Sequence, residues 1–491
     1  MLPVASLPSN WGIGTMGEEA RSFIRFLQAS GQSYWQILPI CQTGFGDSPY
    51  QSVSSFAGNP YWIDLDDLAK DGLLKEEDFS HIDWGRNPRS IDYDKLYINR
   101  FKVLKKAVKC LKQNEPDDYH TFLSAEYDWL EDYALYMAIK EYEGGKPWTQ
   151  WPKGYRLKEE KALNDIRNRL EEDISFWKGV QYLFYHQWRR MRTYAAERGI
   201  QIIGDTPFYV AADSADVWSQ PEQFYLNKEL EPIEVAGCPP DGFSEDGQLW
   251  GNPLYDWDRM KNDGYQWWIR RMAKQIQIYD VIRLDHFRGF DSYYAIPADD
   301  NTARNGHWCQ GPGISLFRIL EKKLGRMNII AEDLGFLTPS VQKLVQECGY
   351  PGMKVLEFAF DERDTGSGYL PHEYPRHCVV YTGTHDNDTV NGWMHTASAS
   401  DVQRAVDYFH LNKEEGYSWG MMRGAWSSVA DLSIMQAQDI LELGSESRIN
   451  IPSTLGNNWV WRSKKGAFTE ELAEKLHYMM SLYGRLPAMK E

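Results

Sequence analysis

The chain has 491 residues, and its charge excludes several classes of partner. Its 53 Lys and Arg residues against 70 Asp and Glu residues give a net charge of −17. This charge disfavours nucleic acid, whose phosphate backbone is bound through Lys and Arg, and anionic membranes. No apolar run approaches the ~20 residues that span a bilayer, so we expect no membrane association, whereas a neutral substrate is compatible with the charge.

The six cysteines are far apart, and none forms a CxxC pair. The sequence therefore indicates neither a zinc site nor a redox motif, and scattered thiols are typical of a reducing compartment. The start, MLPVASLPSNWG, has neither the basic nor the apolar region of a signal peptide. We expect a cytoplasmic protein without a metal or another cofactor.

Short apolar stretches bounded by turn residues predict eight strands. In chain order they are residues 33–40, 60–65, 200–205, 281–286, 328–334, 353–360, 377–386 and 448–453. Helical patterns precede or separate most of them, and this alternation indicates a parallel sheet. Eight repeats favour an α/β fold of the closed (β/α)8 TIM-barrel type over an open doubly wound sheet.

The chain is predicted to be one barrel domain, 1–491, with long loop insertions that form subdomains around the active-site face. The connection between the second and third predicted strands carries apolar residues at helical spacing, and it predicts a mainly helical insertion over 66–175. A second connection, 206–256, is rich in Pro, Gly and Trp with little helical periodicity. Long loops of this kind are often lids, so we predict an active-site lid after the third strand.

Acidic residues end four of the predicted strands, at Asp205, Asp285, Glu332 and Asp386. Catalytic groups of α/β barrels lie at the carboxyl ends of strands. Strands are spaced about 4.8 Å apart, so carboxylates on neighbouring strands lie roughly 5 Å apart, as nucleophile and acid do in retaining glycosidases. Capping a turn is the alternative for each residue alone, and it weakens when four strand ends share the feature.

Arg283 and Asp285 are two residues apart on one strand, so their side chains are predicted to share a face. A guanidinium keeps a neighbouring carboxylate ionised, as a nucleophile must be; a structural ion pair is the alternative. Partial burial of Glu332 raises a glutamate pKa and keeps a proton available for a leaving oxygen. Asp386 can bind two sugar hydroxyls, and His385 can donate to another.

Together these motifs resemble those of the amylomaltases, the 4-α-glucanotransferases of glycoside hydrolase family 77 in the α-amylase superfamily. The similarity covers nearly the whole chain and is carried by SLPSNWGIG, GDSPYQSVSSFAGNPYWIDL, GDTPFYVAADSADVW, GQLWGNPLYDW, IRLDHFRGF, AEDLG, TGTHDNDT and INIPST. The resemblance implies that Asp285 is the nucleophile, Glu332 the acid/base and Asp386 a third catalytic carboxylate. One departure is that related chains usually have several residues, often including Arg and Gly, before LPVASLPS.

The resemblance also implies a set of supporting and substrate-binding residues, which are Arg283, His385, Asp205, Tyr50, Gln248, Trp250, Asn252, Asp361 and Asn458. Tyr50 matches the ring that stacks on the sugar beside the scissile bond, and Gln248, Trp250 and Asn252 fall in the loop that closes over the substrate. The implied reaction moves α-1,4-glucan segments from a donor malto-oligosaccharide or glucan to the 4-hydroxyl of an acceptor, with retention, through a covalent glucosyl-enzyme. The alternatives are an α-glucan hydrolase with the same residues and a catalytically idle glucan-binding protein.

Overall fold

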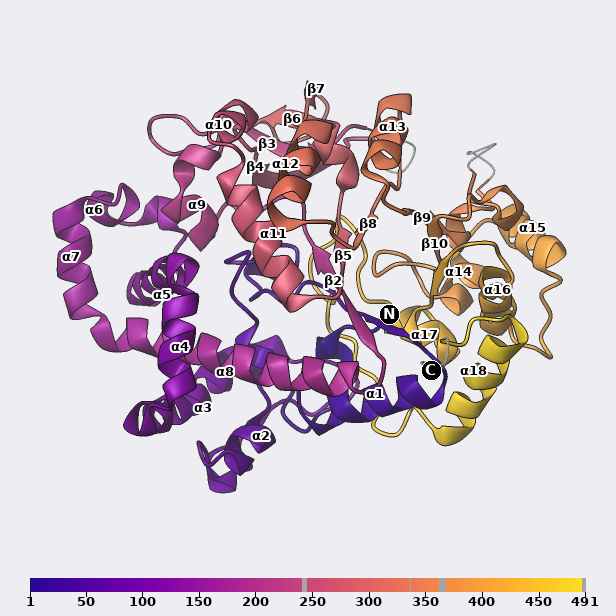
Figure 1. The fold of residues 1–491 in the computed structure, drawn as a ribbon, viewed down its shortest axis with the longest axis horizontal. Coiled ribbons are helices and arrows are strands. Elements are labelled where there is room, and N and C mark those ends of the chain that lie inside the picture. Colours follow the sequence, from indigo (N-terminus) through magenta and orange to yellow (C-terminus); the bar gives the residue numbers. More distant parts are fainter. Residues whose placement is uncertain (241–244, 336, 362–367, 488–491) are drawn as a thin grey trace.

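A parallel sheet that curves into a nearly closed barrel forms the centre of the computed structural model, which describes residues 1–240, 245–335, 337–361 and 368–487. Within these residues the sheet has seven strands, all parallel to their neighbours. Their order is β1 (Tyr34–Gln36), β2 (Gln201–Thr206), β5 (Val281–Leu284), β8 (Ile329–Ala331), β9 (Gly352–Val355), β10 (Cys378–Tyr381) and β11 (Leu432–Ile434). Helices surround the sheet (Figure 1), so the predicted α/β barrel is confirmed.

The first two residues lie between the two outer strands of this sheet. The Leu2 amide donates to the carbonyl of Gln36 on β1 at 3.0 Å, and the Ala437 amide, just after β11, donates to the carbonyl of Met1 at 2.9 Å. Met1 also packs against the apolar side chains inside the barrel, which are Ile203, Ile330, Met353, Val355, Val379, Tyr381 and Ile434. This extended segment therefore fills the position of an eighth strand.

The predicted strand at residues 60–65 is wrong. The structure has a short 3-10 helix there, Pro60–Trp62, followed by α2 (Leu65–Lys70). Asn59 accepts from the Tyr61 amide at 3.0 Å, and Asp64 accepts from the Asp67 amide at 2.8 Å. These side chains cap the two turns, and short apolar stretches do not distinguish strands from buried turns.

The predicted strand at 448–453 is also wrong, because this stretch forms a loop whose amides bond to other loops. The Asn450 amide donates to the His385 carbonyl at 3.1 Å, and the Ile451 amide donates to the Asn458 side chain at 3.0 Å. The last barrel strand is instead β11, a three-residue stretch too short to give a strand pattern.

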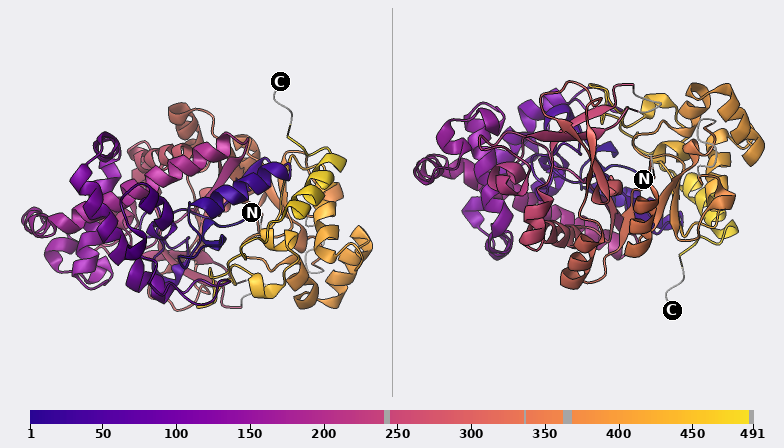
Figure 2. Two further views of the ribbon diagram at one scale, coloured as in Figure 1. Left: turned by 90° about the horizontal axis from the view of Figure 1, so that it is seen from below. Right: turned by 90° about the horizontal axis from the view of Figure 1, so that it is seen from above.

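Helices fill the long connection between β1 and β2. After α2 they are α3 (Tyr93–Asn114), α4 (Asp117–Ala125), α5 (Tyr127–Tyr142), α6 (Lys153–Arg156), α7 (Glu160–Arg169) and α8 (Glu171–Ala196). α3, α4 and α5 pack along α8, and most of the group projects from one side of the barrel (Figures 1 and 2). The mainly helical content agrees with the sequence pattern, but the connection lies between the first and second barrel strands. That 66–175 is an insertion into a barrel loop stays a prediction.

The connection after β2 contains more regular structure than its composition indicates. It carries α9 (Ala215–Ser219), β3 (Glu234–Cys238) and β4 (Gln248–Pro253). These two strands join β6 (Ser292–Pro297) and β7 (His307–Gln310) in an antiparallel sheet of order β4-β3-β6-β7. Strands this short among Gly and Pro residues give little periodicity, and the pairing of β3 with β6 joins residues far apart in the chain. The lid role of 206–256 stays a prediction.

The remaining helices lie around the barrel and the loops and sheet attached to it. They are α1 (Glu18–Ala29), α10 (Trp257–Asn262), α11 (Gln266–Ile278), α12 (Ile314–Leu324), α13 (Pro339–Cys348), α14 (Val390–Thr396), α15 (Ala399–Phe409), α16 (Tyr417–Trp426), α17 (Ala437–Ile440) and α18 (Glu470–Leu482). Amphipathic α1 shows why they pack there, since it buries Phe23, Ile24 and Leu27 on one face. None of the helices in the described ranges is long and apolar enough to cross a membrane.

Candidate active site

A cleft of about 1670 Å³ lies at the carboxyl ends of the barrel strands. Asp285, Glu332 and Asp386 all line it. Its walls come from the loops after the strands, from β4 and from the helices α3 and α5. The three acids that the sequence places at strand ends therefore meet in a single cleft, as active-site groups of such barrels do.

Asp285 and Glu332 are neighbours because their strands are neighbours. Leu284 on β5 and Ala331 on β8 are partners in the sheet register, and each acid is the next residue along its strand. The Glu332 amide also donates to the Leu284 carbonyl at 3.0 Å. The two carboxyl groups thus leave adjacent strand ends toward the same cleft, which confirms the adjacency predicted from the strand pattern.

Arg283 links two acids beneath the cleft. Its Nη1 donates to both oxygens of Asp205 at 2.9 and 2.8 Å and to Oδ1 of Asp285 at 2.9 Å. Arg283 and Asp205 are 4% and 1% exposed, so this pair is shielded from water and its hydrogen bonds are charge-assisted. The predicted common face of Arg283 and Asp285 is confirmed, and the contact fixes the direction of the Asp285 carboxylate.

Glu332 has surroundings that favour the protonated form. Burial raises its pKa to about 8, the negative charge of Asp285 adds to the rise, and Arg283 opposes it. Two backbone amides, which favour the ionised form, also oppose the rise: Oε2 accepts from the His286 amide at 2.6 Å and Oε1 accepts from the Leu334 amide at 3.0 Å. Burial outweighs these contributions, so Glu332 keeps its proton at neutral pH, as a general acid must.

His286 is a cleft residue that the sequence reasoning missed. Its backbone is left-handed, with φ 46° and ψ 48°, which is uncommon for a residue other than glycine and clusters at functional sites. This conformation accompanies the short hydrogen bond from its amide to Glu332. Burial lowers the pKa of its imidazole to about 4, so the ring is neutral at pH 7. The only available signal was its position directly after Asp285.

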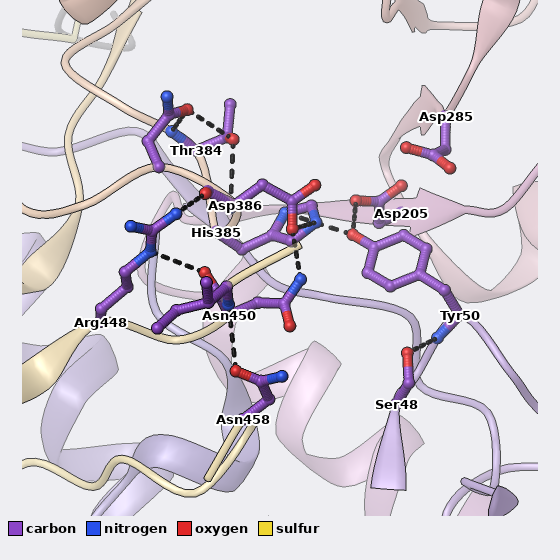
Figure 3. A network of polar contacts seen from close by, with 12 residues as sticks. Ser48, Tyr50, Asp205, Asp285, Thr384, His385, Asp386, Arg448, Asn450 and Asn458 are labelled. Carbon is purple, nitrogen blue, oxygen red and sulfur yellow. Dashed lines mark hydrogen bonds and ion pairs between the residues drawn. The ribbon is translucent and has the colours of Figure 1, made fainter. Parts of the chain in front are cut away.

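Tyr50, Asp205 and His385 form a second group of contacts on the other side of Asp285. The Tyr50 hydroxyl donates to Asp205 Oδ2 at 2.8 Å and lies 3.3 Å from His385 Nδ1. The Tyr50 and His385 rings are stacked, with centroids 4.9 Å apart. Figure 3 shows the hydroxyl between the two partners. These contacts orient the Tyr50 ring at the cleft; that the ring stacks on a sugar stays a prediction.

Asp386 is held by a loop far along the chain. Asn450 Nδ2 donates to Asp386 Oδ1 at 2.7 Å, and Arg448 donates to the Asp386 carbonyl at 2.6 Å. Asn458 braces the same loop by accepting from the Ile451 amide (Figure 3). The side chain of Asp386 is 48% exposed, so it is available to a ligand. Arg448 and Asn450 were missed because their stretch was interpreted as a strand.

Of the other predicted binding residues, three line the cleft and Asp361 does not. Gln248, Trp250 and Asn252 line the cleft from β4; Trp250 Nε1 donates to Gln248 Oε1 at 3.0 Å, and its ring meets the His286 ring edge-on with centroids 5.0 Å apart. Asn252 is 5% exposed and donates to the Val210 carbonyl at 2.8 Å. Asp361 is not among the described residues that line the cleft.

Within the described ranges, no group of three or more His, Cys, Asp and Glu side chains is arranged to hold a metal ion.

Comparison with known proteins agrees with this geometry. A family profile described as 4-alpha-glucanotransferase matches residues 2–468 of the chain. The chain belongs to the 4-alpha-glucanotransferase family. A curated member from Clostridium butyricum is 48% identical over 484 residues, covering 98% of this chain and 99% of the relative, and one from Thermus thermophilus is 45% identical over 497 residues, covering 99% and 98%.

Solved structures place the fold in the same family. The amylomaltase from Streptococcus agalactiae, determined in complex with acarbose, superposes with a TM-score of 0.96 at 40% identity and 99% coverage of both chains. The amylomaltase from Corynebacterium glutamicum has a TM-score of 0.78 at 18% identity, covering 99% of this chain and 75% of that one, and it supports the fold alone. Membership of the 4-alpha-glucanotransferase family therefore agrees with both the barrel fold and the sequence motifs.

Proposed function

We propose that this 4-α-glucanotransferase transfers α-1,4-glucan segments from a donor malto-oligosaccharide or glucan to the 4-hydroxyl of an acceptor. The observation that carries the proposal is the pairing of Asp285 and Glu332 at adjacent strand ends in one cleft. One carboxylate is bonded to a guanidinium and the other has its pKa raised to about 8. A nucleophile and a general acid need these two environments.

In the first step the Asp285 carboxylate attacks the anomeric carbon of the donor. The bond from that carbon to the glycosidic oxygen breaks, and the oxygen takes the proton of Glu332. The product is a glucosyl ester of Asp285 and a shortened glucan with a free 4-hydroxyl. Asp386 binds two hydroxyls of the distorted sugar, and Tyr50 stacks on the sugar ring. Arg283 keeps the Asp285 carboxylate ionised, and His385 supports the Tyr50 ring by stacking on it.

In the second step the 4-hydroxyl of an acceptor sugar attacks the same carbon. Glu332, now ionised, takes the hydroxyl proton, and the Asp285 carboxylate leaves, so two displacements give net retention. Transfer competes with water, and two features favour it: acceptor-side contacts that position the hydroxyl and a lid that excludes water. We assign the lid to 206–256, with Gln248, Trp250 and Asn252 on its cleft side. Asp361, which is not among the described residues that line the cleft, is assigned a supporting role in substrate binding.

Two further assignments belong to this proposal. The helical segment 66–175 is an insertion that extends the cleft, since α3 and α5 contribute lining residues. The protein works in the cytoplasm, where its six cysteines, all free thiols in the structure, stay reduced.

Incubation with maltotriose tests the proposal. A glucanotransferase yields glucose together with oligosaccharides longer than maltotriose, and the total number of reducing ends stays constant. A hydrolase on the same site yields glucose and maltose with rising reducing ends, and an idle binding protein leaves maltotriose unchanged. Either of these outcomes would refute transfer as the activity.

A further inference from the structure

A second, smaller pocket of about 230 Å³ lies apart from the cleft. It is lined by residues of α5, α9 and α11 and by the loop that follows Tyr50, so it lies where the helical connection meets the rest of the protein. None of its described lining residues also lines the cleft. The mechanism above therefore uses no part of this pocket.

Several charged groups of the pocket already have partners in the protein. Glu126 accepts from Lys274 Nζ at 2.6 Å with one oxygen and from Trp129 Nε1 at 2.5 Å with the other. Asp216 accepts from the Ser55 amide at 2.7 Å. These groups are held by contacts within the chain, and they leave little bonding capacity for a ligand.

Two other polar groups of the lining have bonding capacity left. Within the described ranges the Asp132 carboxylate, on α5, forms no hydrogen bond or ion pair, and neither of its oxygens is sealed from solvent. Arg270, on α11, donates from Nη2 to Gln220 Oε1 at 2.5 Å, and its Nη1 has no partner in the same part of the chain. The pocket thus offers a ligand one carboxylate acceptor and one guanidinium donor.

A neutral ligand with several hydroxyl groups suits this lining better than an ion does. A hydroxyl both donates and accepts, so one ligand can donate to Asp132 and accept from Arg270. An anion would lie among four acids and only two bases, and a cation would leave the Arg270 donor without an acceptor. The charged lining residues are Glu126, Asp128, Asp132, Asp216, Arg270 and Lys274.

The size of the pocket limits the ligand to about one sugar ring. A volume of about 230 Å³ corresponds to roughly eight water molecules at ~30 Å³ each. It is below the ~300–1,000 Å³ of pockets that enclose drug-sized ligands, so a glucan segment of several sugars would not fit. The apolar part of the wall is aromatic, as is common in ligand pockets, and comprises Phe56, Trp129, Tyr133 and Trp267.

We propose that this pocket binds a free monosaccharide, and that D-glucose is its ligand because the proposed transfer reaction releases glucose from maltotriose. The choice of glucose rests on the proposed function, whereas the class of ligand, a neutral polyhydroxylated ring, rests on the pocket alone. Glucose bound here lies outside the cleft and does not serve as an acceptor in the reaction.

Titration with D-glucose, followed by ligand-observed NMR, tests the site. Asp132→Ala removes the free acceptor and should weaken binding by at least about tenfold, the loss expected for a hydrogen bond to a charged group. Because Asp132 bonds to nothing in the described protein, this variant should fold and transfer glucan like the wild type. Ala273→Leu fills the pocket from α11 and should abolish binding there.

Two variants serve as controls for the position of the bound glucose. Asp386→Ala alters the cleft, and Asp165→Ala removes an exposed acid on α7; both should leave glucose binding in the pocket within about twofold of the wild type. To separate the two places fully, Asp132→Ala and Ala273→Leu are also combined with Asp386→Ala, and each should show the same loss in that background.

Glucose 6-phosphate tests the charge argument. Its phosphate carries nearly two negative charges at neutral pH and would lie among the acids of the lining, so it should bind at least about tenfold more weakly than glucose. Equal or tighter binding of glucose 6-phosphate would make the pocket an anion site and overturn the neutral ligand class.

Three further results would overturn the proposal: no binding of glucose to the wild type, binding that persists unchanged in Asp132→Ala or Ala273→Leu, or binding that is lost in Asp386→Ala alone, which would place the glucose in the cleft. The titration requires no turnover. A wild-type protein that binds glucose in the pocket but transfers nothing from maltotriose would therefore refute only the proposed function.

Discussion

Raising the pH from 7 to 9 should remove the proton that Glu332 delivers to the leaving glucan. With a pKa of about 8, the protonated fraction is about 91% at pH 7, about 50% at pH 8 and about 9% at pH 9. The initial rate of transfer from saturating maltotriose should therefore fall about tenfold between pH 7 and pH 9, with an apparent pKa near 8. The rise in pKa comes mainly from burial, with a smaller part from Asp285.

The assay compares two donors. Formation of the glucosyl-enzyme from a 4-nitrophenyl malto-oligosaccharide requires little acid assistance, because 4-nitrophenolate is a good leaving group, so its release should show a much weaker decline above pH 8. Glu332→Gln is the matched control: it should stall transfer from maltotriose at every pH, retain nitrophenol release, and remove the alkaline decline. A decline of equal size and midpoint for both donors, or one centred below pH 6, would contradict the acid role derived from the burial of Glu332.

Three further outcomes are expected. Asp285→Ala should lower transfer by at least about 10⁴-fold, a loss comparable to that of other essential catalytic residues, and near-wild-type disproportionation of maltotriose would exclude Asp285 as nucleophile. Trp250→Ala should raise the ratio of free glucose released by hydrolysis to transfer products several-fold, because the ring helps to exclude water; Trp308→Ala on exposed β7 is the control, and equal ratios would contradict the lid. Asp205→Ala should reduce the free energy of unfolding, measured by urea titration, by about 3–5 kcal/mol, because it removes one partner of a buried ion pair. The control is Glu141→Ala, in an exposed pair with Lys105, which should change the free energy of unfolding by about 1 kcal/mol or less. Losses of similar size in the two variants would refute the argument.

Local patterns predicted the parts of the site that depend on single strands. Asp285 and Glu332 directly follow the apolar strands β5 and β8, whereas β10 ends at Tyr381 and Asp386 lies in the turn after it, beyond the strand predicted over 377–386. The alternation of side chains along a strand places Arg283 and Asp285 on one face. Burial of the strand and exposure of its end are both encoded in consecutive residues. Helical spacing likewise predicted most of the α2–α8 segment, because an amphipathic pattern repeats over many turns.

Other parts of the site depend on contacts between residues far apart in the chain. Asn450 reaches Asp386 across 64 positions, and Trp250 meets His286 only because β4 pairs in a sheet outside the barrel. The left-handed backbone of His286 likewise accompanies a hydrogen bond from its amide to Glu332 on the neighbouring strand end.

The sequence by itself determined the alternation of strands and helices and the acids at the strand ends, since both are properties of neighbouring residues. Only the tertiary structure decided how the barrel is completed and which groups control the charge of each acid. Leu2 and Met1 fill the gap beside β1 through bonds to residues at opposite ends of the chain, and the pKa of Glu332 depends on burial by the folded protein. Hydrogen-bond registers and desolvation are set by packing across long sequence separations, and no local pattern encodes them.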